Sequence, residues 1–254
     1  MSSNTSRFDG RADNYVSFRP TYPTEILDTI ISSCSLEPGS PVADIGSGTG
    51  IFSSLLLDRE LNVYAVEPNE GMRSSAERTL ANESRFHSIS GSAEQTTLAD
   101  SSVQAITAAQ AFHWFDLPPT KLEMRRILNP GAHVALIWNQ RDTRTQLQRD
   151  YESILRKHVP DYDHLVHMRI NDGEIEKFLD GGDIETHSST IGQPLDFEGL
   201  LGRMKSSSYV PSQDQPIFAK MANELQILFN EHERHGMVRF DYETKLFIGT
   251  ISES

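Results

Sequence analysis

The sequence holds a single cysteine, Cys34, among its 254 residues. One cysteine excludes a disulfide within the chain and a cysteine-based zinc site. Long apolar runs are also absent: the longest, residues 134–138, is far shorter than the roughly 20 residues that cross a membrane. The N-terminal residues MSSNTSRFDGR are polar and lack the apolar segment of a secretory signal. These features predict a soluble, cytoplasmic protein with no membrane partner.

Basic residues are scarce. Lys and Arg number 23 against 36 for Asp and Glu, which gives a formal net charge of -13. This balance argues against binding to a phosphate backbone, so we expect no nucleic-acid partner. His158, His164 and His167 do not have the spacing of metal ligands, and no metal site is predicted. The length allows one large domain or two small ones and is sufficient for a sizeable core.

Short apolar runs alternate with helix-like segments through the first half of the chain. The runs are bounded by turn residues and have the length of buried strands, whereas the segments between them have amphipathic spacing. Strands are expected at 41–45, 62–67, 85–90, 103–109 and 133–139, and helices at 24–33, 51–57, 70–80 and 117–128. This alternation implies right-handed crossovers and a parallel sheet covered on both faces.

The second half has a different pattern, with helices placed between two late strands. Helices are expected at 145–158, 175–179, 196–206 and 215–232, and strands at 184–191 and 237–251. The last strand can return to the sheet. We therefore predict one α/β domain over 1–254, with a doubly wound, Rossmann-like, mostly parallel seven-stranded sheet and helical cap insertions. Its cofactor-binding core is expected at 36–140, and its cap and substrate-pocket segments at 1–24, 141–172 and 195–236.

A glycine-rich turn follows the first predicted strand directly. It reads Asp44-Ile45-Gly46-Ser47-Gly48-Thr49-Gly50, and Glu67 ends the next strand 23 residues after Asp44. Glycines permit a tight turn and let a ligand approach the backbone, while the following helix directs its amides and positive dipole end toward that ligand. A carboxylate at the end of the second strand is suited to accepting hydrogen bonds from ribose hydroxyls. The combination predicts a nucleoside-bearing cofactor.

The glycine spacing indicates which cofactor. A dinucleotide fingerprint reads G-x-G-x-x-G, whereas this turn reads G-x-G-x-G and has Ile51 at the place of the third glycine. VADIGSGTGIFSSLL (42–56) and VYAVEPNEGMR (63–73) resemble the first two motifs of the class I S-adenosylmethionine-dependent methyltransferases. Residues 91–116 and 128–138 resemble the segments around the fourth and fifth strands of that family.

The resemblance extends over nearly the whole chain. It is nearest to the type 11 small-molecule methyltransferases, in the branch that includes trans-aconitate methyltransferase-like proteins, on FDGRADNYVSFRPTYP (8–23), AFHWF (111–115) and SSSYVP (206–211). It implies S-adenosylmethionine as cofactor, S-adenosylhomocysteine as product and a small-molecule methyl acceptor, with a carboxylic acid as one candidate.

The resemblance also implies which residues hold the cofactor. Gly46, Ser47, Gly48 and Gly50 would surround its methionine part, with Asp44 near the amino group and Glu67 on the ribose. Pro68 and Met72 would pack on the adenine, and Ser92, Ala93 and Glu94 would line the adenine edge. Gln110, Ala111 and Phe112 would lie under the sulfonium. Tyr15 and Arg19 would close over the cofactor, and Arg19 is a candidate partner for its carboxylate.

The acceptor side is less determined by the sequence. His113 is the candidate catalytic residue, as a base or an orienting donor, but it is equally compatible with packing in a strand-to-helix turn. Trp114 is a candidate pocket wall, and Arg203 and Tyr209 are candidate substrate contacts. Arg141 is a further arginine that could pair with an acidic substrate. A general base is needed only where the acceptor arrives protonated.

Two alternatives of other classes stay open. A nicotinamide-dependent oxidoreductase would share the glycine turn and the ribose acid, though not the glycine spacing. A non-catalytic protein could retain the fold. The oligomeric state and the methylated atom are not indicated by the sequence.

Overall fold

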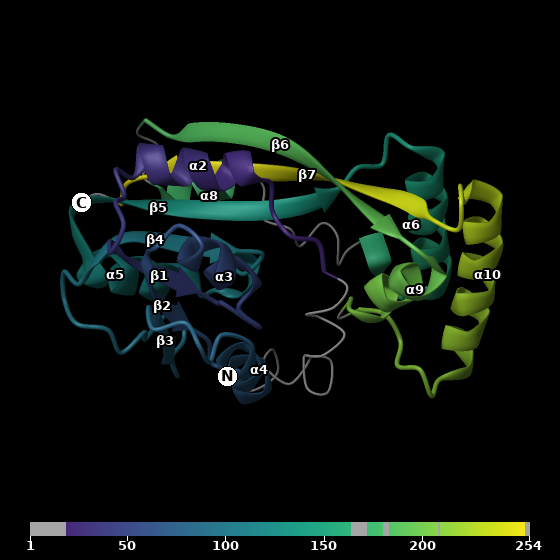
Figure 1. The fold of residues 1–254 in the computed structure, drawn as a ribbon, viewed down its shortest axis with the longest axis horizontal. Helices are drawn as coiled ribbons and strands as arrows, with labels where there is room; N and C mark the ends of the chain where they lie inside the picture. Colours follow the sequence, from purple (N-terminus) through teal and green to yellow (C-terminus); the bar gives the residue numbers. More distant parts are fainter. Residues whose placement is uncertain (1–18, 164–171, 180–182, 208, 252–254) are drawn as a thin grey trace.

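The computed structural model describes residues 19–163, 172–179, 183–207 and 209–251 (Figure 1). Within these residues the strands form a seven-stranded sheet in the order β3-β2-β1-β4-β5-β7-β6. The pairs among β1 to β5 are parallel, and β7 is antiparallel to both β5 and β6. The strands are β1 Pro41–Ile45, β2 Asn62–Val66, β3 Phe86–Ile89, β4 Val103–Ala109, β5 Leu128–Arg141, β6 Glu185–Leu195 and β7 Val238–Gly249. The predicted fold class is confirmed.

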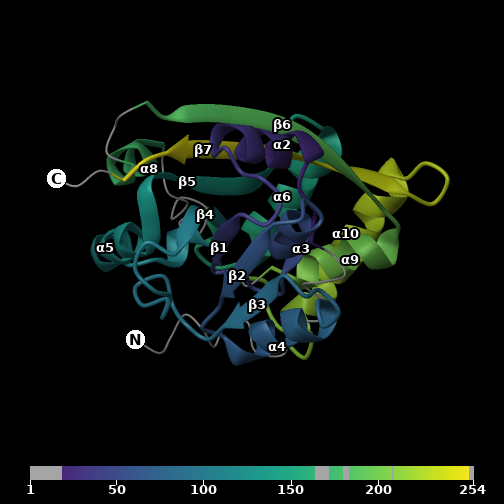
Figure 2. The same ribbon diagram turned by 60° about the vertical axis from the view of Figure 1, so that its left-hand side comes forward.

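Helices cover both faces of the sheet because alternate strand residues point to opposite sides. On one face α2 (Thr24–Ser33) and α3 (Ile51–Leu57) pack on Val42, Val63 and Ile137. Figure 2 shows α2 lying along β7 and β6 on this face. On the other face α5 (Leu117–Ile127) and α8 (Asp172–Phe178) pack on the intervening strand residues. The helix α4 (Glu70–Thr79) contacts β3 at the edge of the sheet.

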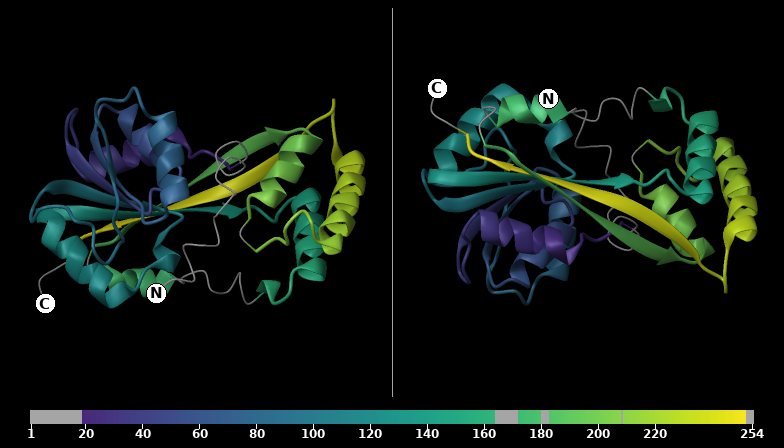
Figure 3. Two further views of the ribbon diagram at one scale, coloured as in Figure 1. Left: turned by 90° about the horizontal axis from the view of Figure 1, so that it is seen from below. Right: turned by 90° about the horizontal axis from the view of Figure 1, so that it is seen from above.

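Three long strands carry a separate group of helices. The strand β5 has 14 residues and β7 has 12, whereas β1 has 5. Their far ends extend beyond the core to α6 (Gln146–His158), α9 (Phe197–Lys205) and α10 (Pro216–His232), as Figures 1 and 3 show. These helices and strand ends, which we call the cap, enclose their own apolar cluster around Tyr151, Leu200 and Phe240.

The main departure from the sequence prediction is the length of β5. Asn129-Pro130-Gly131 was expected to separate a helix from a strand at 133–139, but it lies within β5 at a register shift between Val103 and Ala105 of β4. Gly131 accommodates this irregularity with φ at +77°. At its other end β5 continues to Arg141 because β7 pairs with it that far. No helix within the described residues is both long and apolar enough to span a membrane.

Candidate cofactor and acceptor site

A cavity of about 700 Å³ lies where β1, β2 and β4 end, and it extends to the cap. Most of the predicted site residues line it, although they come from distant parts of the chain. Those that do are Arg19, Asp44, Gly46, Ser47, Gly48, Glu67, Pro68, Met72, Ser92, Ala93, Glu94, Gln110, Ala111, Trp114 and Arg203. This position, beyond the carboxyl ends of parallel strands, is where open α/β sheets bind ligands.

The glycine turn forms one wall of the cavity. The amides of Gly46 and Ser47 both donate to the Val66 carbonyl, at 2.8 and 3.2 Å, which folds the turn against β2. Gly46 has φ at +70°, and a Cβ there would lie 2.5 Å from the Ala111 side chain, so only glycine fits. Gly50 does not line the cavity. It caps the N-terminus of α3 with φ at +83°, and a Cβ there would lie 2.9 Å from Leu80. Its role is therefore to let α3 approach α4.

Asp44 is a buried acid at the end of β1. Its Oδ2 accepts a hydrogen bond from the Ser53 hydroxyl at 2.6 Å, and its Oδ1 accepts one from Thr107 at 3.0 Å. Only 1% of the residue is exposed. Burial raises the pKa of Asp44 to about 6, although the two hydroxyls act in the opposite direction. A carboxylate in this position favours a cationic ligand group.

Glu67 lies against the glycine turn and lines the cavity. Its Oε2 accepts the Gly48 amide at 2.9 Å, and its Oε1 accepts the Asn69 amide at 2.8 Å. These bonds fix the carboxylate, and because each oxygen can accept more than one hydrogen bond, both can also bind a ligand donor. Burial raises the pKa of Glu67, while the backbone hydrogen bonds lower it in part. Asn69 then begins α4 by capping the Met72 amide at 2.9 Å.

Two loops complete the core side of the cavity. Glu94 accepts the Asp116 amide at 3.0 Å, which joins the loops that follow β3 and β4. Partial burial opposes ionisation of Glu94, but this bond and others lower its pKa overall. Gln110, directly after β4, has φ at +57° and donates to the Asn139 carbonyl at 2.7 Å. A non-glycine residue in this region is strained, and such residues often occur at functional sites.

The short 3₁₀ helix η2 (Phe112–Trp114) separates residues that the sequence analysis grouped together. Phe112 is fully buried and packs edge-on against Trp138 and Phe178 in the core, so it does not lie in the cavity. His113 is not among the lining residues either, and its ring stands 4.7 Å from that of Trp114. Tight 3₁₀ geometry directs successive side chains about a third of a turn apart, which brings Trp114 alone of the three to the cavity.

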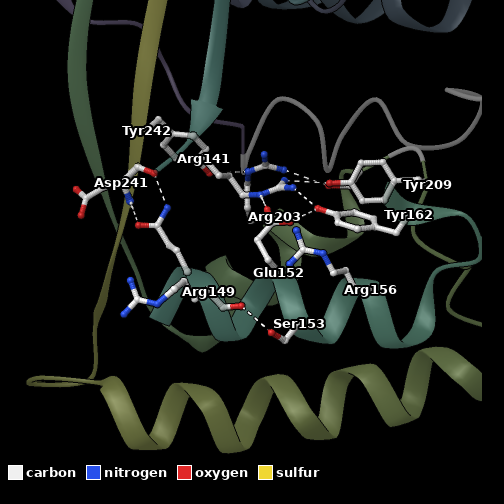
Figure 4. Close-up of polar contacts among 12 residues, drawn as sticks. Arg141, Arg149, Glu152, Ser153, Arg156, Tyr162, Arg203, Tyr209, Asp241 and Tyr242 are labelled. Carbon is white, nitrogen blue, oxygen red and sulfur yellow. Dashed lines mark hydrogen bonds and ion pairs between the residues drawn. The ribbon is translucent and has the colours of Figure 1, made fainter. Parts of the chain in front are cut away.

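Arg203 reaches the cavity from the cap. Its Nε donates to the Tyr242 hydroxyl at 2.7 Å, and its Nη1 donates to the Ser206 and Ser207 hydroxyls at 3.1 and 3.3 Å. Both Arg203 and Tyr242 line the cavity and are buried, at 4% and 1% exposure. Figure 4 shows the two residues beside a second arginine, Arg141.

All three guanidinium nitrogens of Arg141 form hydrogen bonds within the cap. Its Nε pairs with Glu152 at 2.5 Å, and its two terminal nitrogens donate to Tyr209 at 2.9 Å and Tyr162 at 2.6 Å (Figure 4). Tyr209 therefore contacts Arg141 and is not a lining residue of the cavity. Burial alone would raise the pKa of Tyr209, but the charges of Arg141 and Arg203 lower it to about 8.

Several predicted residues have other positions, and some lining residues were not predicted. Arg19 lines the cavity and donates to the Ser206 carbonyl at 2.9 Å. Tyr15, His164 and His167 lie outside the described residues. Among the described residues, no group of His, Cys, Asp and Glu could hold a metal ion. Asn139 and Tyr242 line the cavity but were not predicted. Asn139 ends a predicted strand, so its position could have indicated a site residue. Tyr242 lies inside the antiparallel strand β7, and no sequence motif marks it.

Known proteins are similar to this chain over part of its length. Residues 43–136 match a family described as methyltransferase domain. An uncharacterised methyltransferase of Mycobacterium tuberculosis (strain H37Rv) is 34% identical over 152 residues, which cover 58% of this chain and 58% of that relative. The match thus spans little more than half the length of that relative.

Solved structures match over a greater length. A type II methyltransferase candidate from Anaeromyxobacter dehalogenans is 23% identical and has a TM-score of 0.67, over 93% of this chain and all of that one. A phosphoethanolamine N-methyltransferase of Haemonchus contortus, in complex with S-adenosylhomocysteine, is 14% identical with a TM-score of 0.59, over 98% of this chain and 61% of that one. Residues 43–136 therefore match a methyltransferase family, and the fold of the chain is the Rossmann-like fold of the matched methyltransferase structures.

Proposed function

We propose that this protein is an S-adenosylmethionine-dependent methyltransferase that acts on a small carboxylic acid. The observation that carries the proposal is the buried Glu67 carboxylate held against the glycine turn by the Gly48 amide, inside the segment that matches the methyltransferase family. The matched solved structure with S-adenosylhomocysteine supports the same cofactor through its fold.

The cavity fits this cofactor. Its volume of about 700 Å³ lies in the ordinary range for small-molecule sites, and a Cβ on Gly48 would meet nothing within 4 Å, so the turn leaves open space. Glu67 would accept hydrogen bonds from the ribose hydroxyls, and Asp44 would face the amino group. Pro68 and Met72 would cover the adenine. When bound, the cofactor supplies a methyl group already activated by a sulfonium.

The chain's own contribution is alignment and charge. Asp44 and Glu67 give the cofactor end of the cavity negative charge, which favours a cationic ligand. Trp114 and Phe115 line the cavity with aromatic rings, which give part of its wall an apolar surface. Correct alignment of two reacting groups can contribute about 7–11 kcal/mol in the best intramolecular cases.

The acceptor end favours a carboxylic acid. Arg203 contributes a buried guanidinium that faces the cavity. A carboxylate nucleophile arrives deprotonated, so it needs no general base. This agrees with the position of His113, which does not line the cavity.

Calorimetry with S-adenosylhomocysteine tests the cofactor assignment. The wild-type protein should bind it at one site, and Glu67→Ala should weaken binding about a hundredfold because two hydrogen bonds to a charged group are lost. Glu37→Ala, an exposed acid at the opposite end of β1, should bind like wild type. Saturable binding of NADH in place of S-adenosylhomocysteine would instead favour the oxidoreductase.

Turnover tests the acceptor. A metabolite extract incubated with labelled S-adenosylmethionine should yield a small product one methyl group heavier, identified by mass spectrometry. A carboxyl ester would lose the label on mild alkaline hydrolysis, whereas an ether or amine would keep it. Label that appears only in protein or nucleic acid would contradict the small-molecule assignment.

A further inference from the structure

Arg203 has hydrogen-bond donors to spare at the cavity. A guanidinium carries five N–H donors, of which the Nε donor goes to Tyr242 and the two on Nη1 go to Ser206 and Ser207. In the described part of the chain, no hydrogen bond from Nη2 is present and no carboxylate pairs with Arg203. A buried guanidinium with only hydroxyl partners carries a full uncompensated charge.

The charge of the neighbouring arginine, in contrast, is compensated by a carboxylate. Arg141 is paired with Glu152 and also donates to Tyr162 and Tyr209. Arg141 and Arg203 therefore lie close together in the cap, and the carboxylate of Glu152 pairs with Arg141. Of these two cap arginines, Arg203 is the one that lines the cavity, as Arg19 also does.

Tyr242 adds a second donor at the same place. Its hydroxyl accepts the Nε hydrogen of Arg203, and within the described residues its own proton is not used in another hydrogen bond. Accepting a bond from a cation polarises the hydroxyl and makes it a better donor. The Arg203 Nη2 and Tyr242 hydroxyl donors belong to residues joined by a 2.7 Å bond, and both residues line the cavity.

We propose that Arg203 Nη2 and the Tyr242 hydroxyl together bind one carboxylate of the methyl acceptor, with Tyr242 as a specificity-determining residue. This inference rests on the proposed methyltransferase function and names the residues that select its substrate. The two donors supply one hydrogen bond to each oxygen of a planar carboxylate, and the single positive charge matches its single negative charge.

The other lining arginine, Arg19, donates to the Ser206 carbonyl and is the proposed partner of the cofactor's carboxylate, so Arg203 is left for one anionic group of the acceptor. Asp44, Glu67 and Glu94 give the rest of the cavity negative charge, which would repel a second anion near them. A phosphate dianion would need more donors than Arg203 and Tyr242 offer. A carboxylate is therefore favoured over a phosphate.

Binding of small probes to the S-adenosylhomocysteine-loaded protein tests the proposal without requiring turnover. The probes are butyrate, its neutral amide and inorganic phosphate, titrated by calorimetry. We expect butyrate to bind at least tenfold more tightly than either of the others. Tyr242→Phe should weaken butyrate binding about tenfold and Arg203→Met about a hundredfold, because one removes a neutral donor and the other a charge.

Two controls separate the possible failures. Arg156→Met removes an exposed cap arginine that pairs with Asp163, and it should bind butyrate like wild type. All variants should bind S-adenosylhomocysteine normally; loss of that binding in the wild type would refute the proposed function instead. Tyr242→Phe keeps the buried ring, so it remains informative if Arg203→Met does not fold. Equal binding of butyrate and its amide, tighter binding of phosphate, or unchanged butyrate binding in Tyr242→Phe would overturn the proposal.

Discussion

Asp44 is a buried acid whose ionised form is disfavoured by its surroundings. It is almost fully buried, and its two hydrogen-bond partners are the neutral hydroxyls of Ser53 and Thr107. Burial without a cation raises its pKa to about 6. A bound ammonium group would supply the missing positive charge and lower that pKa again.

Cofactor binding should therefore depend on pH. Below pH 6 the Asp44 carboxyl is protonated and attracts an ammonium group only weakly, so S-adenosylhomocysteine affinity should fall as the pH is lowered from 7.5 to 5. Calorimetry across this range measures the effect. Asp44→Asn should bind weakly throughout and lose the pH dependence; a wild-type affinity that is flat over this range would contradict the contact.

The same acid should make the free protein less stable at neutral pH. The folded pKa lies above the ordinary value of 3.8, so the folded state holds the proton more tightly than the unfolded state. The resulting penalty is absent below pH 4 and complete above pH 6, where it amounts to about 3 kcal/mol.

Asp44→Asn should remove this penalty. Its melting temperature should exceed that of the wild type at pH 8, and the difference should disappear near pH 4. Asp58→Asn, at the exposed end of α3, serves as the control and should show no such difference. A variant that is less stable than wild type at pH 8 would show that the carboxylate's hydrogen bonds outweigh its desolvation.

At the scale of elements, one glutamine joins a helix to the sheet. The side-chain amide of Gln148, in α6, donates to the Asp241 carbonyl at 2.6 Å and accepts the Asp241 amide at 3.1 Å. It thus continues the hydrogen bonding of β7 in place of another strand, and it is completely buried. This contact anchors the cap helices to the strand that carries Tyr242.

Gln148→Leu should destabilise the protein by about 1–3 kcal/mol, because the Asp241 amide would lose its hydrogen-bond acceptor, while the Asp241 carbonyl would keep only the Asp142 amide. Urea unfolding measures the change. Gln146→Leu, two residues earlier on the exposed side of α6, should change the free energy of unfolding by less than about 0.5 kcal/mol. Equal effects of the two substitutions would mean that the amide contact contributes nothing specific.

The elements differ in how well the sequence predicted them. The bounds of β1, β4, α2 and α3 agree with the expectation because each is a buried apolar run or an amphipathic segment between clear turn residues. The extra length of β5 was not predictable, since residues past 139 are polar and are extended only by pairing with β7. The inward turn of Phe112 was missed because a three-residue 3₁₀ helix leaves no periodicity to detect.

At the scale of the whole molecule, core and cap share their framework. β7 contributes Leu246 to the cluster under α2, Phe247 to the cluster under α5, and Phe240 to the cluster inside the cap. Unfolding of β7 would therefore expose apolar residues of all three clusters, in the core and in the cap. We therefore expect the two parts to unfold together, as a single domain.

Two spectroscopic signals test this expectation. Trp114 lies at the cavity and Trp138 lies in the apolar core, so tryptophan fluorescence reports the unfolding of the core and the cavity wall. Far-ultraviolet circular dichroism reports the unfolding of all helices, including those of the cap. The two urea transitions should coincide, and S-adenosylhomocysteine should shift both equally. Separate midpoints would show that the cap unfolds independently.

The residues on the core side of the cavity were predictable from the sequence, and those on the cap side were only partly so. Asp44, Glu67 and the glycines lie in a local strand–turn–helix–strand unit whose motif carries the information. Asn139, Arg203 and Tyr242 meet only through long-range strand pairing and cap packing. Arg203 could be nominated by type, but its partner Tyr242 could not.

The two ends of the cavity are encoded in separate stretches of the chain. Most residues on the core side of the cavity lie between Asp44 and Pro119, inside the family match, whereas Asn139, Arg203 and Tyr242 come after it. Under the proposed function, mutations in the later stretch would change the methyl acceptor and leave the methyl donor's site intact. A library confined to the cap residues around Arg203 would then explore new acceptors with an unchanged cofactor site.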